Sequence, residues 1–190
     1  SGLSRFMGGS GGEEQFQRRK GSSVMKSLVV YSSKSGNTKR VAEAVARGLG
    51  EDTVLATPAD APDYRDFDFV AVGFWIEKER PNFEVQKYLR RLKGKKVGVF
   101  FTLGADPASD HAQICLENVK PFFEENEVLG YFMCQGKIDP ARVKWVRQMP
   151  PSEMLSTEHP AHWDRAALHP DVDDLARAAE TFRSMAASLD

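Results

Sequence analysis

The sequence has few cysteines and no apolar run long enough to cross a membrane. Only Cys115 and Cys134 occur among its 190 residues, and neither belongs to a CxxC pair. Two isolated thiols exclude a disulfide framework or a zinc knuckle, and they favour a reducing, cytoplasmic location. The longest apolar strings, such as residues 97–103, have strand length, whereas a membrane helix needs roughly 20 residues. We therefore expect a soluble protein without a membrane partner.

An excess of basic residues is also missing. The 26 Lys and Arg residues face 27 Asp and Glu residues, for a formal net charge of −1. Because nucleic-acid-binding domains present a basic footprint, a nucleic-acid partner is not expected. Residues 1–24 are rich in Gly, Ser, Gln and Arg and precede Met25, so we interpret them as an expression tag. Residues 25–190 suffice for a single domain with one sizeable core.

Strand and helix patterns alternate along the chain and predict an α/β fold. Short apolar runs typical of buried strands occur at 27–31, 53–56, 67–76, 96–103 and 128–134. Apolar residues at helical spacing occur at 38–49, 83–92, 111–126 and 172–189. This alternation predicts a doubly wound, five-stranded parallel sheet covered by helices on both faces. Five prolines interrupt residues 139–170, where we expect an irregular excursion with a helical part near 142–148.

The first predicted strand leads into a loop of hydroxyl and small side chains, which we name the phosphate loop (residues 33–38). It reads Ser33-Lys34-Ser35-Gly36-Asn37-Thr38 and opens a helix. Backbone N–H groups, hydroxyls and the positive end of the helix dipole would converge there, which predicts a phosphate ligand. The loop is neither the GxxxxGKS/T of Walker A nor the dinucleotide fingerprint GxGxxG. The alternative is ordinary turn and capping chemistry, which Ser and Asn also provide.

Two further loops are expected at the same edge of the sheet, because open parallel sheets bind ligands beyond the carboxyl ends of their strands. One strand ends in Phe74-Trp75-Ile76, and another leads into Thr102-Leu103-Gly104-Ala105. An aromatic ring from the first could stack on a flat cofactor, while amides of the second could bind its edge. Side chains alternate along a strand, so only one of Phe74 and Trp75 faces the core. The alternatives are a core Trp75 and a plain connecting loop at 102–105.

The phosphate loop resembles that of the flavodoxins, of the form S/T-x-S/T-G-N-T, and the order of elements from residue 26 to about 139 is similar too. The resemblance implies a strand order of 2-1-3-4-5 and FMN as the cofactor. A stacking Tyr usual after the strand that corresponds to residues 96–103 is missing, so that flavin face would be open or covered by another segment. The implied cofactor contacts are Ser33, Lys34, Ser35, Gly36, Asn37, Thr38, Phe74, Trp75, Ile76, Thr102, Leu103, Gly104 and Ala105.

This resemblance implies an electron-transfer protein that passes electrons to or from a partner oxidoreductase, since the chain offers a cofactor loop and no evident substrate machinery. One alternative is an NAD(P)H-dependent FMN or quinone reductase, in which residues 139–170 close over the substrate. Another is a phosphate-recognising or partner-binding module that has lost the flavin. The sequence leaves the partner and the oligomeric state open.

Several other residues have structural interpretations. No metal site is expected, because His159, His162 and His169 have no ligand partners that the sequence can place. Asp110 is expected to cap the helix that follows it, and both cysteines are expected to be small buried apolar residues. The charged run at 77–80 is interpreted as a solvated loop, with Lys78 or Arg80 approaching the cofactor as the alternative.

Overall fold

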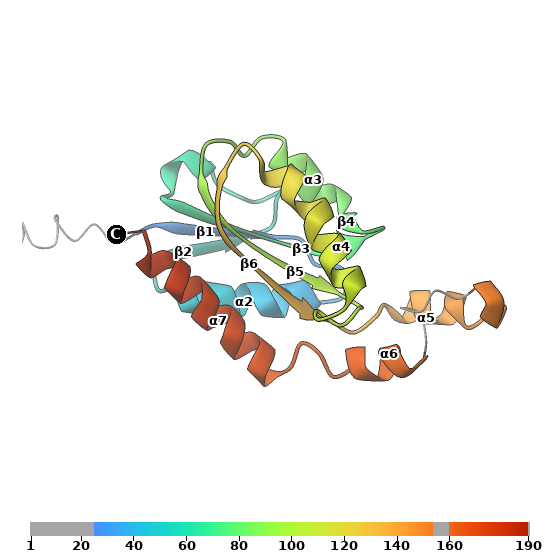
Figure 1. Ribbon diagram of the computed structural model, residues 1–190. Helices are drawn as coiled ribbons and strands as arrows, with labels where there is room; N and C mark the ends of the chain where they lie inside the picture. The colour runs from blue at the N-terminus through green and yellow to red at the C-terminus, as the bar shows by residue number, and fades with distance from the viewer. Residues whose placement is uncertain (1–24, 154–159, 190) are drawn as a thin grey trace, which may run out of the picture.

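The computed structural model describes residues 25–153 and 160–189, which form a sheet between two layers of helices (Figure 1). The parallel strands are β1 (Ser27–Tyr31), β2 (Thr53–Ala56), β3 (Phe69–Glu77), β5 (Lys96–Leu103) and β6 (Glu127–Gln135). Their spatial order is β2-β1-β3-β5-β6, which confirms the predicted doubly wound sheet of five parallel strands. The two-residue strand β4 (Arg80–Pro81) was not predicted and pairs antiparallel with the end of β3.

Helices cover both faces of the sheet. On one face lie α2 (Asn37–Leu49) and α7 (Val172–Ala187), and on the other lie α3 (Phe83–Leu89) and α4 (Asp110–Val119). Alternating strand side chains feed the two cores: Leu28 and Val30 pack into the α3/α4 core, whereas Val29 packs into the α2/α7 core. The expectation that α7 buries Val172 is wrong, because that side chain is 80% exposed at the start of the helix.

Local signals decide where α4 begins and ends. Ser109 caps the helix by accepting a hydrogen bond from the Ala112 N–H at 3.2 Å, so the prediction of Asp110 as the cap is wrong by one residue. The helix was predicted to reach residue 126, but it ends at Val119. Pro121 disfavours α-helix at the residue before it, and the 3-10 helix η2 (Lys120–Phe123) follows. The other described 3-10 helices are η1 (Tyr64–Asp66) and η3 (Pro151–Glu153).

Between β6 and α7 the chain makes a long excursion, residues 136–171, which we name the arm. Its described parts contain α5 (Pro140–Val146) and α6 (Pro160–Ala166). Asp139 caps α5 by accepting from the Ala141 N–H, and Pro140 occupies the first turn, which explains why this helix starts two residues before the predicted 142–148. Figure 1 shows α5 and α6 at the end of the molecule towards which β3, β5 and β6 run.

The remaining expectations from the sequence concern the cysteines, residues 1–24 and membrane-spanning helices. Cys115 and Cys134 are both buried and free, as predicted. Residues 1–24, interpreted as a tag, lie outside the described residues. No helix in the described segments has the length and apolar character of a membrane span.

Candidate functional site

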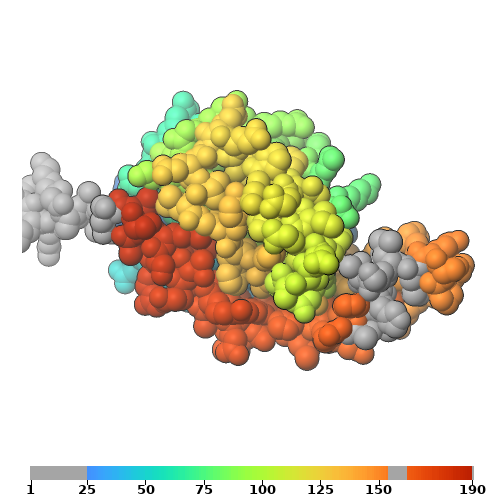
Figure 2. Space-filling view, viewed as in Figure 1, coloured from blue at the N-terminus to red at the C-terminus, as the bar shows by residue number. Residues whose placement is uncertain are grey.

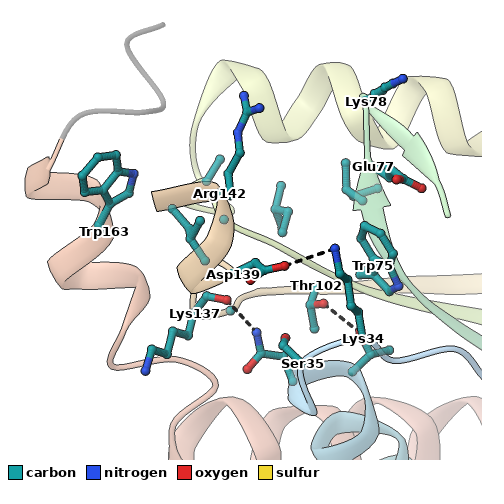
Figure 3. A pocket seen from close by; sticks show the side chains of 18 of the residues that line it. Lys34, Ser35, Trp75, Glu77, Lys78, Thr102, Lys137, Asp139, Arg142 and Trp163 are labelled. Carbon is teal, nitrogen blue, oxygen red and sulfur yellow. Dashed lines mark hydrogen bonds and ion pairs between the residues drawn. The ribbon is translucent and has the colours of Figure 1, made fainter. Parts of the chain in front are cut away.

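A cavity of about 530 Å³ opens at the carboxyl ends of β1, β3 and β5 (Figure 3). Three of its walls come from the segments that the sequence singled out: the phosphate loop, the end of β3 and the loop after β5. The arm supplies a fourth wall, and most of it is the segment 139–170 that the reductase alternative placed over a substrate. The expected place of a ligand, beyond the strand ends, is therefore hollow.

The phosphate loop presents free backbone donors at the start of α2. Gly36 is the N-cap residue of the helix, with φ of 94° in the left-handed region, and it makes no side-chain cap. The Ser33 hydroxyl oxygen accepts from the N–H groups of Gly36 (3.1 Å) and Lys39 (3.2 Å), and so folds the loop on itself. The N–H groups of Asn37 and Thr38 donate to no acceptor in the described part of the chain. Unpaired N–H groups at the positive end of a helix dipole suit an anion.

A pair of buried hydroxyls joins the phosphate loop to β5. The side-chain oxygens of Thr38 and Thr102 lie 2.9 Å apart, and either could be the donor. Both residues line the cavity, although Thr38 is only 1% and Thr102 only 3% exposed. This hydrogen bond fixes two of the predicted contact segments relative to each other.

The end of β3 places Trp75 in the cavity and Phe74 in the core. Trp75 and Ile76 line the cavity, and the Lys34 ammonium lies 5.6 Å from the centroid of the Trp75 ring. Phe74 is fully buried and stacks on Phe101 at a centroid distance of 5.3 Å. Phe74 was predicted as a cofactor contact; strand alternation instead points it away from the cavity.

Behind Trp75 lies a buried amide that sequence reasoning missed. The Asn82 N–H donates to the Trp75 carbonyl (3.1 Å), and the Asn82 side-chain oxygen accepts from the Trp75 N–H (3.4 Å). The Asn82 NH₂ group donates to the Ser32 hydroxyl (2.9 Å), which in turn donates to Glu84 (2.8 Å). Asn82 therefore ties the strand end that carries Trp75 to the start of the phosphate loop. Neither Asn82 nor Ser32 belongs to a recognisable motif.

The β3–β4 connection is a tight hairpin at the rim of the cavity. Glu77 pairs with Arg80, so Lys78 and Glu79 alone form the turn, with φ of 52° and 62°. Two positive φ values are typical of the two-residue turns that match strand twist. All four side chains are exposed, as the solvated-loop interpretation predicts, and Lys78 is the cation among them that lines the cavity.

After β5, the predicted contacts Thr102, Leu103, Gly104 and Ala105 all line the cavity. Gly104 lies against the arm: a Cβ there would stand 2.9 Å from Ile138 Cγ1, closer than real contacts allow. Its carbonyl accepts from the Gln135 side-chain amide at 2.9 Å. The close approach of the arm therefore depends on a residue without a side chain at position 104.

Two polar contacts hold the arm to the phosphate loop. The Asn37 amide donates to the Lys137 carbonyl (2.9 Å), and the Lys34 ammonium pairs with the Asp139 carboxylate (3.1 Å) beside Trp75 (Figure 3). A hydrogen bond from the Ala141 N–H, together with Lys34, holds the pKa of Asp139 below its ordinary value. Buried Val146 and Trp163 complete this wall. Lys34 and Asn37 were predicted contacts of the phosphate loop, whereas no sequence motif pointed to their partners Lys137 and Asp139 or to Val146 and Trp163.

His169 and the two cysteines have structural roles in this fold. The His169 Nδ1 atom lies 2.6 Å from Asp174 and 3.7 Å from Asp171. These two carboxylates also form the capping box of α7, which accounts for their position. His162 lies on α6, and His159 falls outside the described residues. Burial raises the pKa of Cys115 to about 11 and that of Cys134 to about 12, so both thiols are protonated at neutral pH.

Comparison with known proteins identifies the same domain in a family model and in two relatives. A family model described as "Flavodoxin domain" matches residues 28–183. Two relatives are flavodoxin-like domain-containing proteins BilS. The one from Clostridioides difficile (strain CD3) is 28% identical over 169 residues, covering 85% of this chain and 96% of the relative. The one from Clostridium symbiosum (strain WAL-14163) is 29% identical over 175 residues, covering 80% and 91%.

Solved structures match at the level of the fold. A flavodoxin from the domain Archaea superposes with a TM-score of 0.56 at 18% identity, covering 87% of this chain and 99% of that one. A short-chain flavodoxin associated with a bacterial microcompartment superposes with a TM-score of 0.58 at 15% identity, covering 87% and 99%. The arrangement of strands and helices is thus shared along most of both chains.

Proposed function

We propose that this chain, which belongs to the flavodoxin domain family, binds FMN and passes electrons to or from a partner oxidoreductase in the cytoplasm. The observation that carries the proposal is the pair of unpaired N–H groups, of Asn37 and Thr38, at the start of α2 beside a cavity lined by Trp75. An anionic group and an adjacent flat ring are the two parts of FMN that such a site suits.

The residues of the site fit FMN, because one set would bind its phosphate and another would bind its ring. The phosphate loop, which includes Lys34, would hold the phosphate. Trp75 and the backbone of residues 102–105 would hold the ring. When bound, FMN supplies the electron transfer. The arm, with Val146 and Trp163, limits access of water to the cavity, and Asn82 keeps the Trp75 backbone in place.

The two thiols of the chain take no part in the proposed site. Both thiols are buried and protonated at neutral pH, and neither lines the cavity. The contribution of the protein would then be to bind the cofactor, to set its surroundings and to present it to a partner.

A reductase is the second candidate function, and the arm favours it. The cavity extends from the strand ends to Val146 and Trp163, so the arm encloses space beyond the three expected loops. This is the space that a nicotinamide or quinone would need. Anaerobic mixing with NADH or NADPH separates the candidates: a reductase would bleach the flavin absorbance directly, whereas a carrier would require a separate reductase.

The proposal is tested first by the visible spectrum of the protein before and after addition of FMN and exhaustive dialysis. Retained flavin absorbance is the expected result, with loss of that absorbance in a Gly36→Val/Asn37→Ala variant whose circular dichroism shows a folded protein. A parent protein that retains no flavin and leaves FMN fluorescence unquenched would contradict the proposal.

A further inference from the structure

A group of cations lies on α5 and on the residues that flank this helix, beside the cavity. Lys137, Lys144 and Arg147 are exposed, and together we name them the basic face. Figure 2 shows α5, in orange, projecting at one end of the molecule. None of the three forms an ion pair with the residues that the structure describes. Because the chain as a whole has a formal charge of −1, this local excess of positive charge is a departure from its average.

The basic face is hollowed and adjoins the proposed cofactor site. A second groove, of about 550 Å³, is lined by all three cations and, among the residues that the structure describes, by no carboxylate. Lys137 and Ile138 line both this groove and the cavity. An occupant of the groove would therefore stand next to the cavity, where the path for an electron is short.

An exposed aromatic residue lies on the same helix. Trp145 is 50% exposed, and the Arg142 guanidinium stacks on its ring at 4.5 Å. Trp and Arg are the residues most enriched among those that dominate protein–protein binding energy. Trp145 thus offers an apolar anchor among charges that would orient a partner.

The chemistry of α5 favours a protein over a membrane as the occupant. A helix that lies on a bilayer needs a continuous free apolar face. The apolar side of this seven-residue helix is already used, because Val146 is fully buried in the cavity wall and Val143 is half-buried. Charge without a free apolar face suits an acidic protein surface.

We propose that the basic face, with Trp145, docks the acidic surface of the electron-transfer partner, so that carboxylates around the partner's redox centre meet Lys137, Lys144 and Arg147. This inference rests on the proposed function. It specifies the partner as a protein whose redox centre is surrounded by carboxylates. Opposite charges would accelerate the encounter at low ionic strength and fix the orientation of the partner over the cavity.

Two small haem proteins of opposite charge serve as probes: acidic cytochrome b5 and basic cytochrome c. Equilibrium binding of each fluorescently labelled cytochrome is measured with and without FMN, at about 20 mM and about 200 mM salt. We expect cytochrome b5 to bind about tenfold or more tightly than cytochrome c, and to lose this preference at the higher salt.

Variants locate the binding surface. Lys144→Glu should weaken cytochrome b5 binding about fivefold without changing FMN retention, since this side chain does not line the cavity. The matched control is Lys96→Glu, which makes the same charge change on an exposed residue at the amino end of β5. It should leave cytochrome b5 binding within about twofold.

Three results would overturn the inference: equal binding of the two cytochromes, equal weakening by both charge reversals, or binding to phosphatidylserine vesicles in place of cytochrome b5. The binding measurement without FMN keeps this test separate from the proposed function, whose failure would appear as absent flavin absorbance. Electron transfer from the dithionite-reduced protein to cytochrome b5 should show the same dependence on salt and on the two variants.

Discussion

Two walls of the cavity, the phosphate loop and the arm, differ in how far apart in the sequence their contacting residues lie. The phosphate loop is closed by local bonds, such as those from the Gly36 and Lys39 N–H groups to Ser33. The arm reaches the cavity only through long-range contacts; the Asn37–Lys137 hydrogen bond spans 100 residues. The binding loop is thus encoded in a few consecutive residues, whereas the enclosure depends on tertiary packing. Substitutions in the two walls should therefore have different effects on FMN affinity and on the free energy of unfolding.

The largest effect is expected from Gly36→Val in the phosphate loop. Gly36 and Gly50 both have left-handed φ, of 94° and 101°, and a Cβ at either would meet nothing within 4 Å. Valine at either position should therefore cost conformational strain, about 1–3 kcal/mol of unfolding free energy, and the strain should be larger at Gly50, whose ψ of −173° lies in a region populated almost only by glycine. Only Gly36→Val should also weaken FMN binding, by about 100-fold, because it disturbs the donors around the phosphate.

The Gly50→Val protein is the matched control at the opposite end of α2. Urea unfolding measures the strain, and fluorescence titration with FMN measures the binding. Equal loss of FMN affinity in both variants would mean that the loop acts through stability alone.

A smaller effect is expected from Asn82→Ala, which removes the support behind the phosphate-loop wall. The Trp75 and Ser32 groups that Asn82 satisfies would lose buried partners, at a cost of about 1–3 kcal/mol in unfolding free energy. Trp75 would then be held less firmly, so FMN affinity should fall about tenfold. A variant with the predicted stability loss and unchanged FMN affinity would remove Asn82 from the site's supporting structure.

Asp139→Asn tests the arm, and here the expected change has the opposite sign. The Asp139 carboxylate neutralises Lys34 at 3.1 Å and would repel a phosphate beside it. Asparagine can still cap α5, so the arm should stay folded. FMN affinity should rise about threefold and riboflavin affinity should not change, because riboflavin lacks the phosphate.

The control for this charge removal is Asp63→Asn. Asp63 also caps a short helix and also pairs with a nearby cation, Arg65, but it does not line the cavity. The FMN affinity of the Asp63→Asn protein should match that of the parent protein. A weaker FMN complex in Asp139→Asn would show that the ion pair supports the bound state and does not oppose it.

The smallest effect is expected for the cysteines, which belong to the cores and to neither wall. Because burial raises the pKa of Cys115 to about 11 and that of Cys134 to about 12, little thiolate exists at pH 8. Alkylation by iodoacetamide should be negligible at pH 8 in the folded protein and complete in urea, as followed by mass spectrometry. Rapid labelling of the folded protein would show that one of these helices or strands opens readily.

These contrasts also explain what could be predicted from the sequence. The strands, the main helices and the phosphate loop were predictable because they depend on apolar periodicity and on consecutive residues, whereas the strand order came from the resemblance to the flavodoxins. Alternation indicated that one of Phe74 and Trp75 would face the core, but the pairing of β3 with its neighbours decides which one.

The parts that escaped prediction depend on contacts between distant residues. Asn82 acts through Ser32 and Trp75, and Gly104 acts through Ile138 on the arm. Helix α6, which carries Trp163, was interpreted as part of an irregular segment because prolines surround it. In each case the residue type is common and its role appears only when the fold brings its partners together.

The most direct test of the account is the comparison of FMN with riboflavin, which share the ring and differ in the phosphate. Both dissociation constants are measured by flavin fluorescence titration of the protein freed of bound flavin. The account predicts that FMN binds at least about 100-fold more tightly, the equivalent of about 2.7 kcal/mol from the charged hydrogen bonds of the phosphate loop. Equal affinity for the two flavins would contradict the assignment of residues 33–38 as a phosphate site.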